Sequence, residues 1–132
     1  MKRSGLPLLL IASALGGAAV ADETTLPAPS PGEHAFQYCF SCHSVMPGEF
    51  EGLQAPNLAG IVGGPIASEA GFDYSPAMRA FAVRHGDWSF ELLDRFIADT
   101  NGAVPGSTME YPGVKDEAER AALLDYLAAA SR

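Results

Sequence analysis

The sequence predicts an all-α domain that is completed by a bound group rather than by its own side chains alone. Three observations support this fold class. Several segments combine helix caps with apolar residues at helical spacing. Residues 44–74 contain three prolines and several glycines without a sustained period, which predicts a loop too long for a compact domain unless something orders it. Finally, Cys39 and Cys42, the only cysteines, lie three positions apart.

The first two predicted helices begin at the same kind of cap, a serine followed by a proline. Ser30-Pro31 precedes Glu33, which completes a capping box, so a helix is expected to start here and to run into the cysteine motif. Ser75-Pro76 starts a shorter helix that is expected to continue to about Val83.

Two further helices are predicted in the second half of the chain. In residues 89–101 apolar side chains recur at helical spacing, and Gly102 is expected to end this helix in a left-handed C-cap. The last helix begins at Asp116, with Glu119 forming a capping-box-like pair. The residues expected on its buried side are Leu123, Leu124, Tyr126 and Leu127.

The N-terminal residues carry an export signal rather than part of the fold. Lys2 and Arg3 precede an apolar run over residues 6–20, and Ala19-Val20-Ala21 has the small-x-small form of a cleavage site. The run is shorter than the ~20 residues of a membrane span, so an uncleaved anchor is the weaker alternative. We therefore expect a cleaved Sec-type signal peptide over 1–21, a proline-rich leader over 22–31 and one domain over 32–132. The mature protein is expected to be periplasmic, without stable membrane insertion.

The charge of the mature chain limits its partners. After removal of residues 1–21, six basic residues stand against sixteen acidic ones, a formal net charge of −10. This sign argues against nucleic acid and anionic lipid surfaces as partners.

The segment Cys39-Phe40-Ser41-Cys42-His43 has the form of the covalent attachment motif for c-type haem. On about one helical turn both thiols reach the vinyl groups of one porphyrin, and His43 directs a ring nitrogen at the iron. Thioredoxin-like dithiols, plain disulfides and zinc sites share the C-x-x-C spacing. A thioredoxin-like motif needs a βαβ surround, and a zinc site needs more ligands, whereas His34 and His85 form no second pair. One covalent haem c is the prediction.

A second ligand to the iron is expected from Pro105-Gly106-Ser107-Thr108-Met109. A proline-glycine turn can bring a methionine thioether from a loop to the far face of the haem, where sulfur is a suitable ligand. The alternative is that Met109 only fills the core. The rival methionines are weaker candidates: Met1 leaves with the signal, Met46 lies three residues from His43, and Met78 belongs to a helical apolar set.

Together these residues resemble the small single-haem cytochromes c of mitochondrial and bacterial type, with His/Met ligation. The matching features lie between about residues 30 and 129. They are Gly32, Phe36, the C-x-x-C-H motif, Pro56-Asn57-Leu58, Gly71-Phe72-x-Tyr74, Trp88, Pro105-Gly106-x-x-Met109, Glu119-Arg120 and Tyr126-Leu127. The resemblance implies the cytochrome c fold, with three main helices plus a short one and long loops around the haem.

The resemblance also implies roles for individual residues. The Pro56 carbonyl would accept a hydrogen bond from His43, and Tyr74 and Trp88 would donate to a haem propionate, although core packing is the plain alternative for both aromatics. Ser107 joins them in the cofactor-binding set. Where the terminal helices cross, the resemblance places Gly32 and Phe36 against Leu123 and Tyr126.

Several positions depart from the mitochondrial pattern. Phe96 replaces a tyrosine that bonds the methionine sulfur, Gly64 replaces a propionate-binding arginine, and Met78 replaces a pocket asparagine, so the haem pocket should be drier. Only Lys115 aligns with the ring of surface lysines. The acidic residues beside the methionine loop predict a partner with a basic docking patch, or they simply favour solubility. They are Glu110, Asp116 and Glu117.

These features predict a monomeric one-electron carrier that serves redox protein partners and is not an enzyme. A haem enzyme is the first alternative, and it would need an open sixth position on the iron. His85 is the residue that could assist such chemistry, but it lies in a polar turn where a solvated side chain is expected. The second alternative is a dedicated subunit of a larger oxidoreductase complex.

Overall fold

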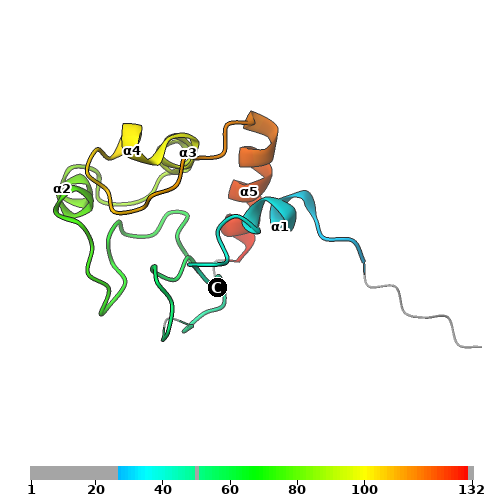
Figure 1. The fold of residues 1–132 in the computed structure, drawn as a ribbon, viewed down its shortest axis with the longest axis horizontal. Helices are drawn as coiled ribbons and strands as arrows, with labels where there is room; N and C mark the ends of the chain where they lie inside the picture. The colour runs from blue at the N-terminus through cyan, green and yellow to red at the C-terminus, as the bar shows by residue number, and fades with distance from the viewer. Residues whose placement is uncertain (1–26, 50, 131–132) are drawn as a thin grey trace, which may run out of the picture.

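The computed structural model describes residues 27–49 and 51–130, and the predicted signal peptide and the first half of the proline-rich leader, residues 22–26, lie outside this part. The described residues form five helices and no β-strand longer than a single bridge pair. In order the helices are α1 (Pro31–Phe36), α2 (Pro76–His85), α3 (Phe90–Ala98), α4 (Thr100–Ala103) and α5 (Glu117–Ala129). Helices α1 and α5 lie together on one side of the molecule, with α2, α3 and α4 on the other (Figure 1). The all-α prediction is confirmed, with one short helix more than expected.

The crossing of α1 and α5 brings the two ends of the domain together. A Cβ atom added to Gly32 would lie 2.5 Å from both the carbonyl oxygen of Ala122 and the Cβ of Tyr126, so only glycine allows this approach. The ring centroids of Phe36 and Tyr126 are 5.4 Å apart, and Leu123 beside them is 1% exposed. This packing agrees with the predicted contact between the terminal helices.

The serine and aspartate caps occur where the sequence predicts them. Ser30 Oγ accepts from the backbone N–H of Glu33, whose carboxylate accepts in turn from the N–H of Ser30. Helix α1 is shorter than predicted, because regular helix ends at Phe36 and residues 37–42 continue as hydrogen-bonded turns. Helix α2 instead extends past Val83 to His85.

The predicted helix over residues 89–101 is broken, and the left-handed cap at Gly102 is wrong. Asp99 has extended backbone angles, φ −157° and ψ 94°, and its carboxylate accepts from the N–H of Gly102 at 2.9 Å. The side chain of Asp99 thus starts the new helix α4. Gly102 lies inside α4 and has no positive φ, and a Cβ at this position would overlap the Asp99 carboxylate, so a larger residue would displace the capping side chain.

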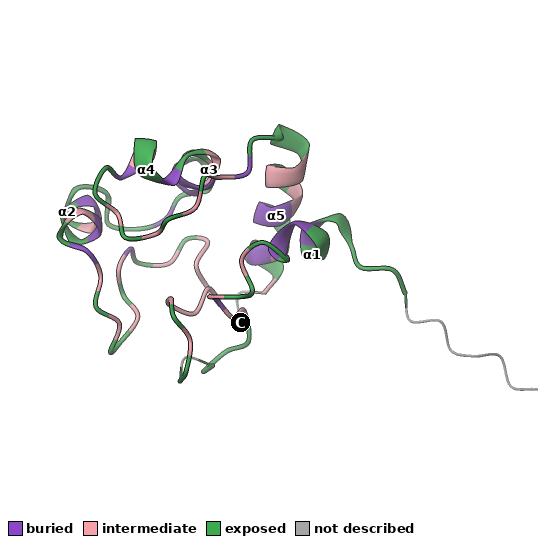
Figure 2. Ribbon diagram, viewed as in Figure 1, coloured by how far each residue is buried: buried purple, intermediate pink, exposed green. Residues whose placement is uncertain are grey.

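The long segment between the cysteine motif and α2 has no helix among its described residues, as predicted. It is fastened to the start of α3 by paired backbone hydrogen bonds of 2.8 Å between Gly63 or Gly64 and Trp88. Buried side chains concentrate in the helices, whereas the segment is largely half-buried or exposed (Figure 2). Within residues 27–49 and 51–130 no helix is long and apolar enough to cross a lipid bilayer.

Candidate haem site

The cysteine motif forms one helical turn. The N–H of His43 donates to the carbonyl of Cys39 at 3.0 Å, the four-residue spacing of an α-helical turn, and the N–H of Cys42 donates to the same carbonyl at 3.1 Å. Both cysteines are half-buried free thiols. The two sulfurs and the imidazole therefore start from a single turn, the arrangement that covalent attachment to one porphyrin requires.

The thiols lack the chemistry of the alternative interpretations. Burial, and then the neighbouring Cys42, raises the pKa of Cys39 to about 11, whereas redox-active dithiols depend on a lowered thiol pKa. In the described part of the chain no group of three or more His, Cys, Asp or Glu side chains is placed to hold a metal ion. Neither observation supports a thioredoxin-like dithiol or a zinc site.

The imidazole of His43 is fixed by a backbone carbonyl. Its Nδ1 lies 2.7 Å from the carbonyl oxygen of Pro56, and the residue is 9% exposed. A carbonyl can only accept, so Nδ1 carries the hydrogen and Nε2 keeps its lone pair for a metal. Burial lowers the pKa of His43, and the bond to Pro56 opposes this effect. Both the tautomer and the neutral form suit axial ligation.

Asn57 connects the two loop segments next to the Pro56 carbonyl. Its side-chain amide donates to the carbonyls of Met46 at 2.7 Å and Glu49 at 2.6 Å, and its oxygen accepts from the N–H of Ala59 at 2.7 Å. These bonds tie residues 44–49 to residues 56–59. The only sequence signal for this role is an asparagine directly after a loop proline.

Met109 lies half-buried against the hydrophobic core, on the segment between α4 and α5. Its N–H donates to Ser107 Oγ at 3.2 Å, and its carbonyl accepts from the N–H of Tyr111 at 3.1 Å. The rivals are placed differently: Met46 is 58% exposed, and Met78 is buried within α2. Met109 thus combines partial burial with a place on a turn, as a ligand from a loop requires.

The aromatic residues of the predicted site lie in the core. Trp88 is 4% exposed, with ring centroids 5.7 Å from Phe81 and 5.1 Å from Phe96. The Tyr74 hydroxyl accepts from the N–H of Glu69 at 3.1 Å, and burial raises its pKa. These contacts are of the kind that core packing predicts, and donation to a propionate by Tyr74 or Trp88 stays a prediction, as does a propionate contact by Ser107.

The departures from the mitochondrial pattern have structural counterparts. Phe96 is buried beside Trp88 and brings no hydroxyl to the pocket. Gly64, at the arginine position, packs against the chain so closely that a Cβ would overlap the carbonyl of Gly60. No larger side chain fits at position 64 without moving the backbone, so this loop conformation excludes an arginine at that position.

Taken together, the donor set fits a covalent haem. It offers two thiols on one turn, an imidazole Nε2 with a free lone pair, and a soft thioether on a separate segment, which is the ligand chemistry of low-spin haem iron.

Comparisons with known proteins give one consistent result, although no protein-family model matches the chain. Cytochrome c-550 of Ancylobacter novellus is 31% identical over 99 residues, which cover 75% of this chain and 92% of that protein. Cytochrome c2 of Blastochloris viridis is 30% identical over 127 residues, or 96% of this chain and 92% of that protein. Among solved structures, cytochrome cH from Methylobacterium extorquens superposes with a TM-score of 0.66 and 30% identity, covering 75% of this chain and 95% of that one.

Proposed function

Because this chain belongs to the small single-haem cytochrome c family, we propose that it carries single electrons between redox proteins outside the cytoplasm. Its cofactor is one covalent haem c, and it is an electron-transfer protein rather than an enzyme. When bound, the haem supplies an iron that accepts and releases one electron. The protein's own contribution is to hold that iron and to limit its ligands.

The hydrogen bond between His43 and Pro56 is the observation that carries this proposal. In our assignment Cys39 and Cys42 would hold the haem through two thioethers, and His43 Nε2 and the Met109 sulfur would supply the two protein ligands of its iron. The 2.7 Å bond holds the imidazole in the tautomer and orientation that ligation needs. Two protein ligands would leave no open position for a substrate and would let the iron change oxidation state with little rearrangement.

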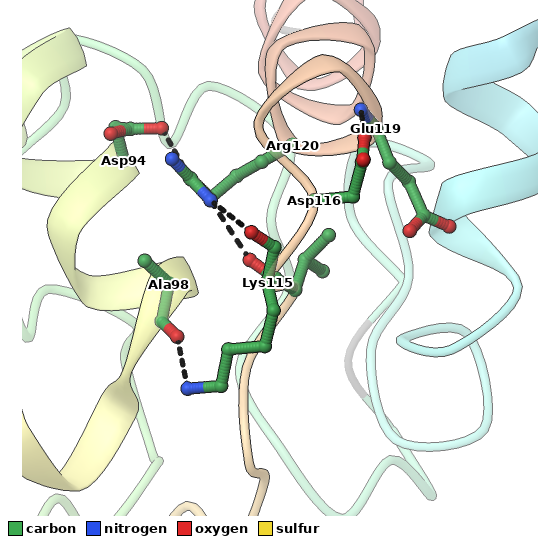
Figure 3. A network of polar contacts seen from close by, with 7 residues as sticks. Asp94, Ala98, Lys115, Asp116, Glu119 and Arg120 are labelled. Carbon is green, nitrogen blue, oxygen red and sulfur yellow. Dashed lines mark hydrogen bonds and ion pairs between the residues drawn. The ribbon is translucent and has the colours of Figure 1, made fainter.

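The cellular setting of the proposal rests on the sequence. Residues 1–21 have the form of a cleaved signal peptide, so we place the mature monomer in the periplasm. Along the chain after the proposed methionine ligand, Glu110, Asp116 and Glu117 are exposed. Lys115 is the one lysine of the mature chain, and its Nζ donates to the carbonyl of Ala98 at 2.7 Å (Figure 3). A redox partner with a basic docking patch suits this surface.

A spectrum of the haem-loaded protein tests the proposed ligation. The oxidised protein should be low-spin at neutral pH and should show a weak thioether-to-iron charge-transfer band. Met109→Ala should abolish this band, while Met46→Ala, the matched change at an exposed methionine, should leave it intact. High-spin iron at neutral pH, or ready carbon monoxide binding by the unmutated reduced protein, would contradict the carrier function and favour an enzyme.

A further inference from the structure

Thr100 makes an unusual pair of contacts for a residue at the start of a four-residue helix. It is 0% exposed, and the break at Asp99 separates it from α3. Its hydroxyl donates to the carbonyl of Tyr111 at 2.5 Å and lies 3.4 Å from the carbonyl of Met109. A buried hydroxyl requires a partner, and this one finds its partners on the segment that carries the proposed ligand.

The segment around Met109 is otherwise shaped by local bonds. Met109 bonds to Ser107 on one side and to Tyr111 on the other, which folds residues 107–111 into a compact turn. The two ends of the segment are anchored separately: the N–H of Ser107 donates to the carbonyl of Val104 at 3.0 Å, and the N–H of Val114 donates to the carbonyl of Ile97 in α3 at 2.9 Å. Gly106 and Gly113 on either side both have positive φ, 87° and 93°. The hydroxyl of Thr100 connects the turn to α4.

We propose that Thr100 is the positioning residue that keeps the Met109 thioether directed into the core, where it can occupy the sixth coordination position. The inference rests on the proposed ligation by Met109. Thr100 does not touch the iron. Its hydroxyl bonds the Met109–Tyr111 backbone turn and so restricts the positions that the Met109 thioether can take. Loss of the hydroxyl leaves the carbonyl of Tyr111 without its buried donor and allows the turn to open.

The test compares valine at two threonines of the haem-loaded protein. Thr100→Val removes the hydroxyl and keeps the shape, and Thr108→Val makes the same change at an exposed residue next to Met109. Imidazole competes with the thioether for oxidised iron, so its affinity reports how firmly Met109 is held. We expect Thr100→Val to raise imidazole affinity roughly tenfold, the effect of about 1.4 kcal/mol, and to weaken the charge-transfer band. Thr108→Val and the hydroxyl-retaining Thr100→Ser should stay close to wild type.

A second pair of measurements separates positioning from general stability. In a Met109→Ala background the sixth position is already open, so adding Thr100→Val should leave imidazole affinity unchanged. An equal effect in both backgrounds, or wild-type affinity in Thr100→Val, overturns the inference. Thr100→Val places a methyl group where the hydroxyl was. Thr100→Ala removes the hydroxyl without adding that methyl group, so the test can still be made if the valine variant does not fold. A wild-type protein without the charge-transfer band would overturn the Met109 assignment itself, which distinguishes the two failures.

Discussion

The guanidinium of Arg120 on α5 bonds the carboxylate of Asp94 on α3, with Nε 2.6 Å from Oδ1 (Figure 3). Its Nη1 also donates to the carbonyl of Val114 at 3.0 Å and lies 3.4 Å from that of Lys115. The Arg120 side chain is 12% exposed, so these bonds are shielded from water. One side chain therefore joins α3, α5 and the segment that leads from Met109 into α5.

Removing Arg120 should cost much more than removing the charge of Asp94. Arg120→Ala is expected to lower the free energy of unfolding by about 2 kcal/mol, because the carbonyl of the buried residue Val114 loses a charged donor and Asp94 loses its partner. Asp94→Asn should cost about 0.5–1 kcal/mol, since Asp94 is more exposed and Arg120 keeps its bond to Val114. Denaturant unfolding of the haem-loaded variants measures both values. Equal costs would show that the ion pair, and not the backbone bonds, is the main contribution.

Gly32 should not tolerate a larger side chain. Gly32→Ala is expected to destabilise the protein by about 2–3 kcal/mol, because the new methyl group would be forced against α5. Gly52→Ala is the control: it meets no atom within 4 Å but has φ 83°, so only backbone strain of about 1 kcal/mol applies. Thermal or denaturant unfolding compares them. A smaller effect at Gly32 than at Gly52 would mean that α1 and α5 separate easily.

The capping box of α1 should make a pH-dependent contribution to stability. The Ser30 backbone N–H, and then its hydroxyl, hold the pKa of Glu33 below its ordinary value of 4.5. A lowered folded pKa stabilises the protein above the unfolded pKa, and this stabilisation is lost as the pH falls through the folded value. Glu33→Gln should therefore be less stable than wild type at about pH 6, with the difference disappearing near about pH 3. Unfolding curves at both pH values would contradict this if the difference grew on acidification.

Salt should slow electron exchange with positively charged partners. The full sequence has a formal net charge of −8, and removal of the proposed signal peptide would make it −10. Electrostatic attraction should therefore speed encounters with a cationic complex such as hexaammineruthenium, and added salt should screen this attraction. The anionic complex ferricyanide should show the opposite salt dependence in stopped-flow measurements. Glu110→Lys should reduce the salt effect seen with a basic redox protein more than Glu91→Lys, an equal charge change at an exposed position on α3. Equal effects would place the docking surface elsewhere.

Features that depend on neighbouring residues are the ones that sequence reasoning recovers. The caps at Ser30, Ser75 and Asp116 join atoms three positions apart, and each occurs as predicted. The error at residues 99–102 has the same local origin. Aspartate is common at the N-cap of a helix and glycine at its C-terminal end, and the periodicity of apolar residues does not decide between the two. In the structure Asp99 caps the start of a new helix.

Contacts between distant residues could not be derived in this way. Thr100 bonds partners nine and eleven positions away, and nothing in its neighbourhood distinguishes it from a solvated helix residue. The bond between His43 and Pro56 spans thirteen positions and was expected only from the resemblance to a known family. Asn57 was part of the same motif, yet its bonds to Met46 and Glu49 appear only when the loop is folded.

The crossing of α1 and α5 has a consequence for the order of folding. It joins segments separated by about ninety residues, so the domain cannot close until nearly the whole chain is available, and the loop entropy of that closure is large. A haem tethered at Cys39 and Cys42 and held by Met109 would act as a cross-link that divides this loop into shorter ones, much as a disulfide does. Cofactor attachment would then be a step in the folding of the chain as well as the source of its redox activity.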